Sequence, residues 1–149
     1  DPDVTHLQIP FNVLDWRWER TELPRIRLSR PDLTIYARSV YLQGILLSPT
    51  EKWPKVSNLD ANLVATQLDT LGASLGRRTR KELCLSFVQS QKWIDSLVLG
   101  MDSVEQLKEN CQLMGLPKLS DEDCTYVRSN LPKSPEAFLN PSLWDRQDA

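Results

Sequence analysis

The stretch around Gly100 has the residue pattern best suited to binding an anion. An apolar run, 97–99, ends at Gly100, and Ser103 precedes a helical pattern with Gln106 three residues further on. This S-x-x-Q spacing is a capping box, which fixes where a helix begins. The free N–H groups and the positive dipole end of such a helix suit a phosphate. The alternative interpretation is a well-capped helix that follows a buried strand and binds nothing.

Polar residues also mark two other predicted strands. Arg38 and Ser39 lie at the end of an apolar run, and Gly44 follows shortly after. Parallel α/β folds bind their ligands at such carboxyl-terminal strand ends. Gln8 is a polar side chain within the first apolar run, and a buried glutamine needs a hydrogen-bond partner. That partner is either a cofactor carboxamide or a neighbouring backbone group.

Three strands and the helices between them must position these residues. We expect strands at 4–12, 33–40 and 94–99, a helix or turn at 23–29, helices at 59–76, 77–88, 103–114 and 120–130, and a proline-rich tail at 131–149. The crossovers are long enough for parallel strands, which indicates an α/β fold. Three strands cannot hide both faces of a parallel sheet, so these units need neighbours.

The helical stripes predict which side chains enter the core. On the first long helix the stripe is Leu59, Leu63, Val64, Leu68 and Leu71, and on the next it is Leu83, Phe87 and Val88. Val104, Leu107, Cys111 and Met114 form another stripe. The three cysteines fall on helical stripes and are expected to be small core residues. The charge run 77–81 is interpreted as a solvated helix start.

Composition excludes several classes of function. The chain has 149 residues, fewer than the ~250 of a complete (β/α)₈ barrel. Its 18 Lys+Arg and 20 Asp+Glu give a net charge of -2, which argues against nucleic-acid binding. No apolar run approaches the ~20 residues of a membrane span. One histidine and three cysteines without metal-ligand spacing predict no metal site and reduced, cytoplasmic thiols. Because the chain opens Asp1-Pro2-Asp3 without Met, we expect a piece of a longer protein.

Three blocks in order resemble the aldo-keto reductase superfamily. The blocks are 7–15 (LQIPFNVLD), 37–44 (ARSVYLQG) and 100–110, in which Gly100, Ser103, Gln106, Leu107, Glu109 and Asn110 match; the segment 140–144 (NPSLW) resembles the family's C-terminal end. The resemblance covers nearly the whole chain. It implies a partial TIM barrel, with residues 1–149 forming the last three strand-helix units, the C-terminal helix and the tail of a single domain.

The resemblance implies NAD(P)H-dependent reduction of aldehydes or ketones by the intact protein, with NADP, or NAD, as cofactor. By analogy Gln8 would bind the nicotinamide carboxamide and Arg38 would stack on the ring. The other implied contacts are Ser39, Leu42 and Gly44 at the pyrophosphate, Gly100 and Ser103 at the adenosine phosphate, and Gln106, Glu109 and Asn110 near the 2′-phosphate and adenine. Many NADP-preferring members carry Lys or Arg where Gly100 and Gln106 stand, so the choice between NADP and NAD stays open.

The family's catalytic Asp, Tyr, Lys and His belong to strand units that precede this sequence, so the resemblance predicts no catalytic residue here and an inactive isolated chain. Its expected partners are a small-molecule carbonyl substrate and the N-terminal half of the barrel, with no nucleic acid or membrane. Asn12, Trp16 and Trp18 line a substrate pocket or cover the barrel rim. Two alternatives stay open: a non-enzymatic, nucleotide-sensing regulatory subunit of the same fold, and a complete chain that closes a barrel with another subunit.

Overall fold

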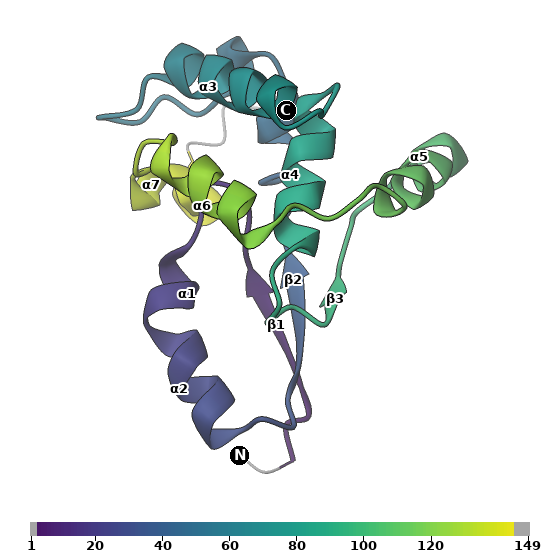
Figure 1. Ribbon diagram of the computed structural model, residues 1–149. Helices are drawn as coiled ribbons and strands as arrows, with labels where there is room; N and C mark the ends of the chain where they lie inside the picture. Colours follow the sequence, from purple (N-terminus) through teal and green to yellow (C-terminus); the bar gives the residue numbers. More distant parts are fainter. Residues whose placement is uncertain (1–2, 145–149) are drawn as a thin grey trace.

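A three-stranded parallel sheet organises the structure, a computed structural model that describes residues 3–144 (Figure 1). Strands β1 (His6–Pro10), β2 (Thr34–Arg38) and β3 (Ser96–Leu97) lie in the order β1-β2-β3, which confirms the predicted parallel arrangement. The strands are shorter than the apolar runs. β1 ends at Pro10, since proline has no N–H to donate. β3 is the shortest, yet backbone bonds from the N–H groups of Asp95 and Val98 to β2 extend its pairing.

The helices follow the predicted order, with two short additions, α1 and α7. They are α1 (Arg17–Arg20), α2 (Glu22–Ser29), α3 (Ala61–Ser74), α4 (Arg80–Gln89), α5 (Val104–Met114), α6 (Asp121–Ser129) and α7 (Glu136–Leu139), with 3-10 turns at Ile45–Leu47, Thr50–Lys52 and Pro141–Leu143. Asp60, Thr79, Ser103 and Ser120 cap α3 to α6, each accepting the N–H of the third residue beyond it. These caps explain why the helices begin within one to three residues of the predicted starts.

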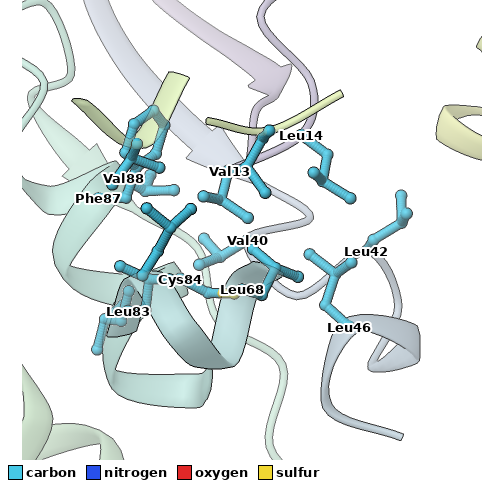
Figure 2. Close-up of a cluster of buried hydrophobic side chains, with 14 of the residues drawn as sticks. Val13, Leu14, Val40, Leu42, Leu46, Leu68, Leu83, Cys84, Phe87 and Val88 are labelled. Carbon is cyan, nitrogen blue, oxygen red and sulfur yellow. The ribbon is translucent and has the colours of Figure 1, made fainter. Parts of the chain in front are cut away.

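The main core packs α3, α4, α6 and α7 against the loops that follow β1 and β2. Figure 2 shows the part of this core that α3, α4 and the two loops form. The predicted inward side chains of α4, Leu83, Phe87 and Val88, are fully buried. On α3 the prediction for Leu63 is wrong, because its side chain is 52% exposed. Leu63 shares its helix face with Gln67 and Thr70, whereas the buried side chains lie on the neighbouring face.

The C-terminal segment is more than an irregular tail. Helix α7 buries Phe138 and Leu139, and the Trp53 ring stacks on Phe138 at a centroid distance of 5.3 Å. The Trp144 indole N–H then donates to the Phe138 carbonyl at 3.0 Å. The aromatic residues of the tail therefore fold it onto the core. Residues 145–149 of the predicted tail and residues 1–2 lie outside the described part.

The two faces of the sheet are covered unequally. Ile9 and Ile35 on one face pack against Leu23 of α2 and are buried. Because side chains alternate along a strand, Gln8, Tyr36 and Arg38 lie on the other face, where they are exposed or half-buried. A parallel sheet normally has both faces covered. One face of this sheet is thus open in the described chain.

The apolar stripe of α5 is also uncovered. Val104, Leu107 and Met114 are 60%, 45% and 41% exposed, and Cys111 is exposed. The prediction of a core position is therefore wrong for Cys111, whereas Cys84 and Cys124 are buried. Helix α5 follows the edge strand β3 and stands apart from α3 and α6 in Figure 1, so no described element covers its stripe. None of the helices in residues 3–144 combines the length and the apolar character that crossing a membrane requires.

Candidate functional site

A cavity of about 450 Å³ lies at the carboxyl-terminal ends of β2 and β3. Its walls come from the loop after β2, the segment after β3, and helices α4 and α5. Six of the ten predicted cofactor residues line it together: Ser39, Gly44, Gly100, Gln106, Glu109 and Asn110. They come from three separate parts of the chain, and the parallel sheet brings these parts to one edge.

The loop after β2 has an unusual backbone where it borders the cavity. Ser39, Leu42 and Gln43 have φ values of 60°, 46° and 54°, and Gly44 has 84°. A left-handed conformation costs a non-glycine residue about 1–2 kcal/mol. Such strain persists only where the surroundings enforce it, and it occurs often at ligand-binding positions. Here burial of the Leu42 side chain and a bond from Asn12 Nδ2 to the Ser39 carbonyl at 3.3 Å hold the loop in place.

The start of α5 borders the same cavity. Ser103 Oγ accepts the Gln106 N–H at 3.2 Å, which confirms the predicted cap. The Gln106 side chain returns to the N–H of Asp102 at 2.8 Å rather than to that of Ser103. The N–H groups of Val104 and Glu105 have no intrahelical partner, because they lie in the first turn. These N–H groups are the ones that an anion at this helix start would meet.

Lys81 is a cavity residue that the sequence interpretation missed. Its Nζ lies 2.5 Å from Glu109 Oε2 and 5.9 Å from the centre of the Tyr41 ring, and its side chain is 17% exposed. The interpretation of 77–81 as a solvated helix start is therefore wrong for Lys81. A signal was present, since Cys84 and Leu85 follow at helical spacing on the buried side of α4.

Two buried polar atoms that belong to cavity residues have no hydrogen-bond partner within the described chain. They are Asn110 Oδ1, in a residue only 5% exposed, and the Tyr41 hydroxyl. Leaving such an atom unpaired costs about 1–3 kcal/mol. Burial raises the pKa of the Tyr41 hydroxyl well above its usual value. Both residues line the cavity, but these two atoms are themselves buried beneath its wall.

The other four predicted cofactor residues do not line the cavity. Gln8 and Arg38 lie on the open face of the sheet, where Gln8 pairs with Tyr36, two residues before Arg38. Arg38 contacts the Ser39 hydroxyl at 3.4 Å, so the open face adjoins the cavity. Leu42 is buried beneath the loop, and the Ser103 hydroxyl serves as the cap of α5.

The three predicted substrate-pocket residues form internal contacts in the loop after β1. Asn12 is fully buried, and its Oδ1 accepts the N–H groups of Leu14 and Asp15 at 2.9 and 3.1 Å. The Trp16 indole donates to the Val13 carbonyl at 2.9 Å, and its ring packs on the main core. Trp18 packs against the small apolar cluster that Ile9, Leu23 and Ile35 form between the sheet and α2. Among residues 3–144 no group of three or more His, Cys, Asp or Glu side chains is placed to hold a metal ion.

No protein-family model matches the sequence, and no curated protein matches it either. Solved structures do match. The holo form of aldo-keto reductase AKR11C1 from Bacillus halodurans superposes with a TM-score of 0.68 at 20% identity, over 89% of this chain and 44% of that chain. The apo form of the same reductase superposes with a TM-score of 0.67 at 20% identity, over 87% of this chain and 44% of that chain. The glycerol dehydrogenase AKR11B4 from Gluconobacter oxydans superposes with a TM-score of 0.64 at 15% identity, over 87% of this chain and 44% of that chain. The chain therefore has the α/β fold of part of an aldo-keto reductase barrel and spans less than half the length of these structures.

Proposed function

We propose that this chain is the cofactor-binding, C-terminal part of an aldo-keto reductase, a nicotinamide-dependent oxidoreductase acting on aldehydes or ketones. The observation that carries the proposal is that six residues that the resemblance assigned to the cofactor line one and the same cavity. The fold shared with the holo form of a reductase supports it. We also propose a cytoplasmic location, in keeping with three free thiols.

The residues divide between the two ends of the dinucleotide. Ser39 and Gly44 would approach the pyrophosphate, with the first turn of α5 nearby. Glu109 and Asn110, which line the cavity from α5, would lie near the adenine. Gln8 and Arg38 would meet the nicotinamide on the open face of the sheet, which would be the inside of the barrel. The bound cofactor would supply the hydride, and these residues would bind and orient it.

Binding without turnover is the expected behaviour of the isolated chain. In calorimetric titration we expect NADH or NADPH to bind, and Asn110→Ala to weaken binding about tenfold, the equivalent of 1.4 kcal/mol. With an activated aldehyde we expect oxidation of NADPH no faster than without protein. Absence of nucleotide binding by the folded chain would refute the proposed function, and rapid turnover would refute the assignment of catalysis to residues outside this sequence.

The uncovered surfaces indicate where the remainder of the barrel would dock. A groove of about 840 Å³ runs between the edge strand β3 and α5, and Leu107, Cys111 and Met114 line it. The free edge of β3 offers backbone groups to a further parallel strand. We infer that the N-terminal strand-helix units of a barrel occupy this surface. A strand would extend the sheet, and its helix would cover the apolar stripe of α5.

Cys111 provides a direct test of this docking. It is the exposed thiol of the three, whereas Cys84 is fully buried and its burial raises its pKa to about 12. A thiol reagent should therefore label Cys111 in the folded chain and spare Cys84. Co-expression with the N-terminal half of a homologous reductase should slow that labelling at least tenfold. Equal labelling rates in a co-purified complex would place the partner elsewhere.

A further inference from the structure

Helix α5 is attached to the rest of the chain by few apolar contacts, and it extends away from α3, α6 and α7 (Figure 1). Asn110 is its one buried residue and Leu113, which packs on the main core, is half-buried; the remaining side chains of α5 are exposed. By contrast, α4 buries the whole run from Leu83 to Val88. Regions that bury little apolar surface open most readily in a folded protein. We therefore expect α5 to open more easily than α4.

The segments at the two ends of α5 have few hydrogen bonds to the rest of the chain. Before α5, the last bond to the sheet runs from the Val98 N–H to the Ala37 carbonyl at 2.8 Å. Within the described chain, the backbone groups of residues 99–101 form no hydrogen bond. After α5, the chain is next held at the Pro117 carbonyl, which accepts from Arg77 Nη2 at 2.6 Å. The two segments can therefore act as hinges.

Polar contacts from α4 hold α5 in place. Lys81 Nζ lies 2.5 Å from Glu109 Oε2, and the Gln89 amide donates to the Met114 carbonyl at 3.0 Å. The ion pair is partly shielded from water, because the Lys81 side chain is 17% exposed. This position of α5 also has a cost, since Gln89 Oε1 and Asn110 Oδ1 are buried without a hydrogen-bond partner in the described chain. Water can reach these oxygens once α5 moves away, which favours opening.

Helix α5 also forms the wall between two spaces. The cavity of about 450 Å³ lies on one side and the groove of about 840 Å³ lies on the other, and Asn110 lines both. Gly100, Gln106 and Glu109 form the α5 side of the cavity, whereas the opposite side belongs to the loop after β2 and to α4. The cavity therefore keeps both walls only while α5 lies against α4.

We propose that residues 100–116 form a hinged arm, that the Lys81–Glu109 pair is its latch, and that opening of the arm removes one wall of the cavity. A detached helix of 11 residues is marginal in water, so the arm unwinds as it opens. A ligand that contacts both walls binds the closed arm alone, and its apparent affinity falls with the closed fraction. Because this holds for any ligand of the cavity, it goes beyond the proposed function.

Hydrogen–deuterium exchange of the full chain, followed by mass spectrometry, tests the arm. After correction for intrinsic rates, we expect the amides of α5 to exchange at least about 100-fold faster than those of α4. Lys81→Met, which removes the ion pair, should speed exchange in α5 about three- to fivefold and leave α4 and α6 unchanged. The matched control is Lys92→Met, since Lys92 Nζ lies 2.5 Å from Asp121 Oδ2 in an ion pair outside α5. This control should leave exchange in α5 unchanged.

A double variant separates the latch from a general loss of stability. Glu109→Gln removes the other charge of the pair, so it should also speed exchange in α5, and adding it to Lys81→Met should change nothing further. Exchange in α5 as slow as in α4, or additive effects of the two substitutions, would overturn the hinged arm. Equal acceleration in every helix, or the same acceleration of α5 by Lys92→Met, would overturn it as well. None of these outcomes depends on nucleotide binding, so the proposed function is tested separately.

Discussion

Replacing Gly100 by valine should separate nucleotide binding from stability. A side-chain carbon at Gly100 would meet no other atom within 4 Å, and the φ of Gly100 lies outside the left-handed region. The folded chain can therefore accept the larger residue. Loss of glycine's freedom in the unfolded chain should raise the free energy of unfolding by about 0.4–1 kcal/mol.

The same substitution should weaken binding, because Gly100 lines the cavity and the new side chain would extend into its space. If it blocks one hydrogen bond to a charged phosphate, the loss is about 1.5–3 kcal/mol. That loss corresponds to a dissociation constant about 10- to 150-fold higher. Gly100→Ala, with a single added carbon, should show a smaller effect.

Titration with NADH and urea unfolding of the same samples measure the two quantities. Ala73→Val, at an exposed position of α3 outside the cavity, is the control for a gain in side-chain size and should leave binding unchanged. Wild-type affinity in Gly100→Val would show that no ligand approaches this backbone. A loss of stability above about 1 kcal/mol would show that the folded chain has no room for a side chain at Gly100.

Two further predictions concern stability. Bonds from the Ile35 N–H at 2.7 Å and from Arg27 at 3.0 Å lower the pKa of Asp95, so its contribution is present above the unfolded-state pKa and is lost as pH falls through the folded one. Because the Asp95 side chain is 44% exposed, we expect Asp95→Asn to lower the free energy of unfolding by only about 1 kcal/mol at pH 7, and by less in acid. Urea unfolding of both proteins between pH 3 and pH 7 tests this expectation. Phe87→Ala, in the core, should cost about 3–5 kcal/mol, whereas Leu28→Ala, at 88% exposure, should change stability by less than about 0.5 kcal/mol in the same assay; similar losses would contradict the assigned core.

The sequence alone determined the order of the elements and the helix starts. Local signals decide both, because a cap such as Ser103 acts within three residues and the crossovers fix parallel strands. The residue blocks that resemble aldo-keto reductases also identified the fold, which the solved structures match at no more than 20% identity. Periodicity further located the buried stripe of α4, since its neighbours lie within the chain.

Only the tertiary structure decided which faces are covered and which charges meet. The apolar stripe of α5 predicts a buried helix face from the sequence alone. Burial depends on what packs against the stripe, and no described element covers it. Lys81 reads as part of a solvated charge run, yet the packing of α4 beside α5 places it against Glu109, 28 residues further along the chain. Periodicity records where apolar and charged side chains fall on their own helix. The partner that each one finds depends on long-range packing, which local pattern does not encode.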